Sequence, residues 1–205
     1  MRTLVHVTAH ADGRIVHRAE GALAVRQTGG ATVHLAGTAA GPLGGDEVRV
    51  ELHVLAGARL RVRTVAASVV LTGRSCTVWQ LEVAPDGCLE VCPEPTVVTA
   101  QAVHRNEVRA VLDPGAGLLL IERVQLGRAG EAPGAWTGLL HVDRAGRPLL
   151  RHETTLGPGD VLGPATALTS TLRVPDDTPA GVLGAVVVLP LAGGGTLTTE
   201  LRDRL

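Results

Sequence analysis

One carboxylate, Glu122, stands in the middle of an apolar segment and is the residue of this chain best placed for chemistry. Read as a strand, residues 118–126 alternate and place one row on a single face: Leu118, Leu120, Glu122, Val124 and Leu126. A buried carboxylate is costly unless it is paired or takes up a proton. We expect Arg128 to be its partner, because Gly127 can turn the chain between them. A structural ion pair at a strand end and a polar lining for a site or passage both remain open.

The spacings of the cysteines and histidines indicate a metal site less clearly than Glu122 indicates a polar site. Cys88, Glu90 and Cys92 share one face of a predicted strand, and thiolate and carboxylate ligands could hold a metal there. Packing of the two cysteines as small apolar side chains is the favoured interpretation. Of the eight histidines, His6 and His10 have a four-residue spacing, but they lie in a strand-like segment rather than a helix. We expect most histidines to lie on polar strand faces at the surface.

Several enzyme classes are excluded by what the chain lacks. It contains no Lys, which removes phosphate-binding loops and Schiff-base chemistry, and it has no G-x-S-x-G nucleophile motif. Glu122 and Glu131 could serve a carboxylate-based hydrolase in a groove. The chain has no Phe and no Tyr, so there is little to stack against sugar rings, and only Trp79 and Trp136 are aromatic.

Composition and charge set the remaining expectations. With 205 residues, a net charge of -1 and no basic run, a single domain spanning 1–205 is expected, and nucleic-acid binding is not. Three cysteines argue against a disulfide framework. The N-terminus lacks the apolar core of a signal peptide, and the apolar run 182–192 is interrupted by Gly184 and Pro190. We therefore expect a cytoplasmic protein with no membrane contact.

The elements that must position these residues are predicted to be strands. Apolar and polar residues alternate over 48–54, 58–63 and 77–83, and no long segment has a helical period. Turn glycines recur about every 30 residues, at Gly57, Gly87, Gly115 and Gly146. This pattern favours an all-β, β-helix-like or stacked-sheet solenoid, although the hairpins of a sandwich can have similar spacing. Two short helices are expected, one near 177–179 and one over 198–205.

Four short motifs occur in an order that resembles a known family. Glu122, Gly127-Arg128 and Gly130-Glu131 are similar to an E…GR…GE signature, and residues 89–98 are similar to L-E-W-L-P-Q-E-T-I. Gly44-Gly45-Asp46 matches G-G-D, and Gly57-Ala58 with Thr64 resembles a G-A-x-x-x-x-T-T-Q strand. Together they resemble the UreD (UreH) family of urease accessory proteins. The segment after about residue 158 matches poorly.

The resemblance implies a non-catalytic maturation factor with a β-helix-like fold. Such a factor would bind the urease apoenzyme, join UreF-like and UreG-like accessory proteins, and help deliver nickel, which it would hold only transiently. Carboxylate oxygens bind Ni²⁺ modestly, which suits a conduit better than a store. The candidate lining residues of a nickel route are Asp46, Glu94, Glu122, Arg128 and Glu131. Further structural or tunnel-lining candidates are Gly44, Gly45, Thr64, Glu90, Pro93, Gly127 and Gly130. The alternatives are the carboxylate hydrolase and a β-rich protein-binding module without a metal role.

Overall fold

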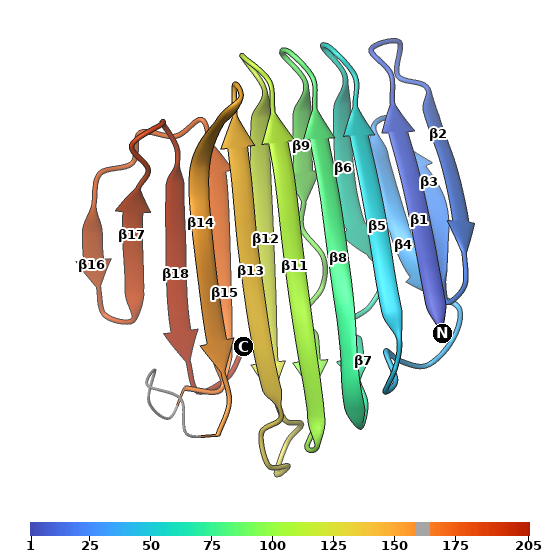
Figure 1. Cartoon of the computed structure of the whole chain (residues 1–205), viewed down its shortest axis with the longest axis vertical. Helices are drawn as coiled ribbons and strands as arrows, with labels where there is room; N and C mark the ends of the chain where they lie inside the picture. The colour runs from blue at the N-terminus through green and yellow to red at the C-terminus, as the bar shows by residue number, and fades with distance from the viewer. Residues whose placement is uncertain (159–164) are drawn as a thin grey trace.

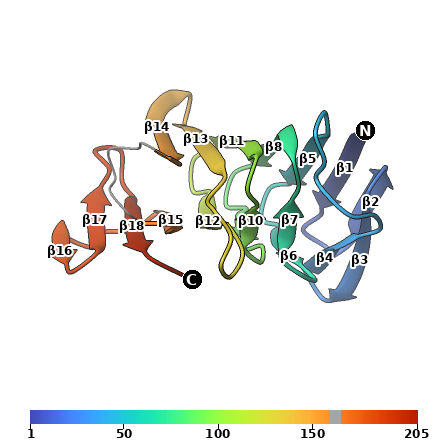
Figure 2. The ribbon, with the colours of Figure 1, turned by 90° about the horizontal axis from the view of Figure 1, so that it is seen from below.

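Two sheets lie face to face in the computed structural model, which describes residues 1–158 and 165–205 (Figures 1 and 2). The first, sheet A, contains in spatial order β14 (Arg147–Leu156), β13 (Ala135–Arg144), β11 (Ala102–Leu112), β8 (Gly73–Val83), β5 (Glu47–Val54), β1 (Arg2–Ala9) and β2 (Ile15–Glu20). In Figure 2, sheet A is the upper of the two layers.

Sheet B forms the second layer and carries the remaining strands. Its spatial order is β16 (Gly181–Leu183), β17 (Val186–Pro190), β18 (Thr196–Arg202), β15 (Ala167–Val174), β12 (Gly117–Leu126), β9 (Cys88–Val91), β6 (Arg59–Thr64), β4 (Thr32–Gly37) and β3 (Leu23–Gly29). Two short strands, β7 (Ser68–Val70) and β10 (Thr96–Val98), pair with each other, and β10 also pairs with β12.

The central part of the chain is a solenoid, as the sequence repeat predicts. The strand pairs β5–β6, β8–β9 and β11–β12 each pass from sheet A to sheet B, and equivalent strands pair in parallel. Gly57, Gly87 and Gly115 lie in the three turns between the paired strands. The fourth repeat differs, because Gly146 lies in the turn of an antiparallel hairpin between β13 and β14, where the coiling stops.

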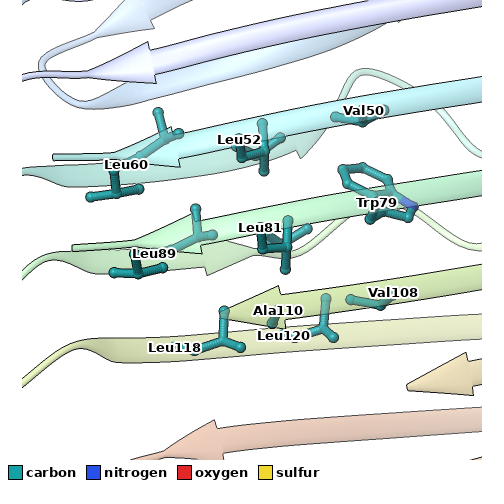
Figure 3. Close-up of a cluster of buried hydrophobic side chains, with 14 of the residues drawn as sticks. Val50, Leu52, Leu60, Trp79, Leu81, Leu89, Val108, Ala110, Leu118 and Leu120 are labelled. Carbon is teal, nitrogen blue, oxygen red and sulfur yellow. The ribbon is translucent and has the colours of Figure 1, made fainter. Parts of the chain in front are cut away.

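Register between coils aligns the inward side chains into ladders. In sheet A, Val50 is paired with Trp79 and Trp79 with Val108. In sheet B, one ladder contains Leu60, Leu89 and Leu118. Figure 3 shows these side chains directed into the space between the sheets, where they are buried. The predicted alternation of 48–54, 58–63 and 77–83 is confirmed by this arrangement, and aliphatic side chains supply most of the core.

Both expected helices are wrong, since residues 1–158 and 165–205 contain no helix. Near 177–179 the Asp176 carboxylate accepts hydrogen bonds from Asp177 and Thr178 and from the Thr196 hydroxyl, and so holds an irregular loop. The C-terminal segment forms β18 between β15 and β17. Among the described residues there is therefore no helix long and apolar enough to cross a bilayer.

The core consists of two apolar clusters with polar residues between them. Along β12, Leu118 and Leu120 belong to the first cluster, while Val124 and Leu126 belong to the second. Glu122 lies between these two pairs. On the facing sheet the same level carries four inward polar residues. We call these four residues together with Glu122 the polar belt, which comprises Ser75, Thr77, His104, Asn106 and Glu122.

Candidate functional site

A cavity of about 560 Å³ lies between the sheets at the level of the polar belt. Its walls include Thr77, His104 and Asn106 from sheet A and Glu122 from sheet B, together with many apolar side chains. Trp79 and Leu120, drawn in Figure 3, line it where it meets the first apolar cluster. The cavity is large enough for a small ligand or several waters.

Glu122 lies in this cavity wall with a partner that the sequence did not indicate. The amide nitrogen of Asn106 donates a hydrogen bond to the Glu122 carboxylate across the space between the sheets. The predicted pairing with Arg128 is wrong. Burial, only partly offset by the Asn106 hydrogen bond, raises the pKa of Glu122 to about 7. Near neutral pH this side chain can therefore either hold a proton or present a charged carboxylate to a cation.

A second, small void adjoins the site on the other side of Glu122. It has a volume of about 10 Å³, on the order of the space one water needs. Its lining includes Glu122, Trp136, His152 and Ser170. Because Glu122 lines both voids, it stands at the junction between them.

Asp46 also lines the large cavity, at the β5 end. Its carboxylate accepts hydrogen bonds from the amino group of Met1 and from the backbone N–H of Leu43, and these contacts lower the pKa of Asp46. Gly44 and Gly45 shape the adjoining loop without lining the cavity. Their backbone N–H groups donate to the carbonyls of residues 72 and 74.

Thr64, Pro93 and Glu94 line the same cavity from sheet B and the loop that follows β9. The Thr64 hydroxyl accepts a hydrogen bond from the backbone N–H of Glu94 (2.8 Å). Arg123, next to Glu122 in sequence, donates to the carbonyl of Pro93 (2.7 Å) and lies 3.7 Å from the Glu94 carboxylate. These contacts connect the motif segments 89–98 and 122–131 in space.

The rest of the E…GR…GE signature does not reach the cavity. Arg128 pairs with Glu131 in the exposed loop after β12 (Nε to Oε2, 2.9 Å), and this contact lowers the pKa of Glu131 to about 2. Gly127 and Gly130 have positive φ angles that form the loop. A Cβ at Gly127 would lie 2.8 Å from the carbonyl oxygen of Glu131, so this turn requires glycine.

Glu90 lies on the outer face of sheet B. Its carboxylate is 3.2 Å from the guanidinium of Arg61 and 3.7 Å from that of Arg63. Glu90, Cys88 and Cys92 do not form a metal-ligating group in the part of the chain that the structure describes. Cys92 is instead a buried core residue, in line with the favoured interpretation.

Sequence reasoning missed the sheet A half of the polar belt. The His104 ring lies 2.9 Å (Nδ1) from the Ser75 hydroxyl, and burial lowers the pKa of His104 to about 4, so the imidazole is neutral at pH 7. The signal that could have revealed it is the coil repeat. Ser75 and His104 occupy paired positions in neighbouring strands, as do Thr77 and Asn106, so polar residues recur where apolar ladders would otherwise continue.

Comparison with known proteins gives one consistent result. A family model described as UreD urease accessory protein matches residues 6–203. The chain is similar to urease accessory protein UreD 1 of Saccharopolyspora erythraea, with 40% identity over 185 residues, 84% of this chain and 72% of that protein. It is also 40% identical to UreD of Frankia alni, over 84% of this chain and 68% of the relative. UreD of Streptomyces avermitilis is 36% identical over 98% of this chain and 90% of the relative.

Proposed function

Because the chain belongs to the UreD family of urease accessory proteins, which supports a role in urease maturation, we propose that it assists nickel delivery to the urease active site. In this role it binds the urease apoenzyme and joins UreF-like and UreG-like accessory proteins in one complex. Nickel is its cargo and does not stay bound. The protein itself performs no chemistry on urea.

One observation carries this proposal: the cavity and its junction with the second void at Glu122. A conduit needs continuous space in the interior and polar groups along it, whereas a core that serves stability alone is apolar and close-packed. The large cavity supplies carboxylates at Asp46, Glu94 and Glu122. Glu122, which also lines the small void, is the group that a passing ion would meet at the narrow point.

The side chains present suit temporary contact with a divalent ion. His104 is neutral at pH 7, the form in which imidazole binds metals. Glu122 can lose its proton when a cation approaches and regain it when the cation leaves, because its pKa lies near neutrality. Oxygen ligands favour modest Ni²⁺ affinity, which allows release.

The hydrolase alternative has less support. A two-carboxylate mechanism requires both groups to flank one substrate bond. Glu122 lines the cavity, while Glu131 pairs with Arg128 in a loop and is not among the described residues that line it. A protein-binding module without a metal role remains the second candidate, and the following experiment separates it from a delivery factor.

The test is the nickel content of urease produced with and without this chain. We expect urease co-expressed with the full set of accessory proteins to contain nickel, and urease produced without this chain to be present but poor in nickel. The measurement is elemental analysis of purified urease. Equal nickel loading in both cases would refute the delivery role.

Two matched carboxylate variants test whether nickel delivery depends on the cavity. Glu122→Gln alters the cavity wall, and Glu90→Gln alters the outer face of a neighbouring strand in the same sheet. We expect Glu122→Gln to lower urease nickel content while copurification with urease persists, and Glu90→Gln to leave nickel content unchanged. If Glu122→Gln abolishes copurification instead, the residue supports complex formation and the conduit proposal fails at this point.

A further inference from the structure

We propose that the outer face of sheet A carries a binding site for a divalent transition-metal ion, formed by His6, Glu51 and His53. The site lies on the opposite face of sheet A from the internal cavity. It does not depend on the proposed function, because it is argued from the geometry of these side chains alone. Its failure would leave the delivery role untouched.

The strand register brings the three residues together. β1 and β5 are parallel neighbours, with His6 paired to Glu51 and Thr8 paired to His53. The inward partners on these strands, such as Val5 and Val50, are buried, so the alternate residues form the outer face. One potential ligand atom from each of the three side chains lies within 4.8 Å of the others. Small side-chain rotations would bring all three to one ion.

The two imidazoles are already held in contact. Their ring centroids are 4.8 Å apart, and Nδ1 of His6 lies 3.5 Å from the Glu51 carboxylate. The three side chains are partly exposed, at 40% for His6, 26% for Glu51 and 30% for His53. An ion can therefore reach them from solvent without opening the fold.

Neighbouring groups orient both rings in the way metal-ligating histidines are usually oriented. Nε2 of His6 lies 3.1 Å from the Thr8 hydroxyl, and Nδ1 of His53 lies 2.9 Å from the Glu82 carboxylate. His53 therefore keeps Nε2 for an ion, and Nδ1 of His6 faces Glu51, the carboxylate that would share the ion with it. A carboxylate behind a histidine fixes the ring and strengthens it as a ligand.

Positive charges near the site limit its affinity. The Arg49 guanidinium lies 3.7 Å from the Glu51 carboxylate and would compete with an ion for it. Arg18, the β2 neighbour of His6, is engaged by Glu20. Glu20, Glu51 and Glu82 outnumber these two arginines by one, so the carboxylates and guanidiniums around the site together carry a negative charge that favours a cation.

The donor set identifies the class of metal. Two imidazoles and a carboxylate suit Ni²⁺, Zn²⁺, Co²⁺ or Cu²⁺, whereas Mg²⁺ and Ca²⁺ prefer oxygen ligands alone. We therefore expect selectivity for first-row transition metals over Mg²⁺. A β-sheet surface also holds the ligands on rigid elements, which limits the adjustment that binding requires.

Calorimetric titration of the full chain with Ni²⁺, Zn²⁺ and Mg²⁺ tests the site. We expect a site for one Ni²⁺ or Zn²⁺ ion that His6→Ala or His53→Ala weakens by at least about tenfold, and no effect of Mg²⁺. Glu82→Gln should weaken it less than either histidine variant. Paramagnetic broadening by Ni²⁺ should affect the His6 and His53 ring protons first.

The chain offers a matched control in His141. It lies in the same outer row of sheet A as His6, on β13, but faces Arg109 and Arg151 across the pairing. His141→Ala should leave the affinity unchanged, and so should Glu90→Gln on the outer face of sheet B. Unchanged binding in both His6→Ala and His53→Ala would overturn the proposal, as would loss of the same site in His141→Ala or Glu90→Gln.

Discussion

At the residue scale, Glu122 links the two facing sheets through its hydrogen bond with Asn106 and lines both voids of the interior. The alternation of 118–126 predicted that Glu122 shares a face with four apolar residues, and the structure confirms this. Its partner could not be predicted, because Asn106 lies on another strand and contacts Glu122 across the interior. Arg128 is close in sequence, but the turn at Gly127 directs it to Glu131.

The first prediction concerns the pH dependence of stability. Folded Glu122 keeps its proton up to about pH 7, whereas in the unfolded chain it releases it near the ordinary value of 4.5. Between these values the folded state binds more protons, so this residue makes stability fall as pH rises from about 4.5 to 7. We expect Glu122→Gln to remove this loss, which amounts to about 3 kcal/mol above pH 7. Denaturant unfolding at pH 5 and pH 8 measures it.

Arg128→Leu serves as the control for that prediction. The side chain is exposed in the loop after β12 and does not contact Glu122. Its removal should leave the pH dependence between 4.5 and 7 as in the parent protein. A steeper loss of stability with pH in Glu122→Gln than in the parent would show that the carboxylate is stabilised by charge, contrary to the burial argument.

At the element scale, the strands of the three coils could be predicted from local pattern, whereas the two segments expected to be helices are a loop and a strand. Alternation and turn glycines were enough to predict the three coils, because each coil repeats the same local pattern. The helix expected near 177–179 failed because Asp176 hydrogen-bonds a loop where a helix N-cap was expected. The helix expected over 198–205 failed because its threonine-rich start pairs on both sides with strands that a local pattern does not reveal.

The second prediction concerns close packing within β13. A Cβ at Gly138 would overlap the indole ring of Trp136, which is 2% exposed and therefore has little room to move. We expect Gly138→Ala to destabilise the fold by about 1–3 kcal/mol through overpacking. Gly181→Ala in β16 is the matched control, since nothing lies within 4 Å of its added methyl. Urea unfolding followed by tryptophan fluorescence measures both, and equal midpoints would contradict the packing argument.

The third prediction concerns the edge strand β16. Among the described residues β16 pairs only with β17, and it exposes Val182 (74%) and Leu183 (84%). Exposed apolar edge strands favour association between molecules. We expect the double change Val182→Lys and Leu183→Lys to reduce aggregation of the isolated chain, as measured by light scattering. Unchanged aggregation would place the self-association elsewhere.

At the scale of the whole molecule, polar residues divide the apolar core into two clusters, whereas a core built for stability alone would be one continuous apolar cluster. The two apolar clusters are separated by the polar belt, and the cavity lies at that level. Proteins commonly accept a loss of stability where function requires polar groups or space. The sequence carried this information in the coil repeat, but it becomes visible only when the register of β8, β11 and β12 is known.

The last prediction tests whether the polar belt exists for transport. Replacing the interacting pair Asn106 and Glu122 by leucine in one double variant would join the two apolar clusters, since buried polar pairs can often be exchanged for apolar residues without loss of stability. We expect the double variant to unfold at a higher denaturant concentration than the parent at pH 8. We also expect it to copurify with urease yet leave the enzyme poor in nickel, because the junction at Glu122 is then closed to ions. Thermal or urea unfolding, copurification and elemental analysis measure the three outcomes. A stabilised variant that loads urease with nickel normally would show that the belt is not on the route.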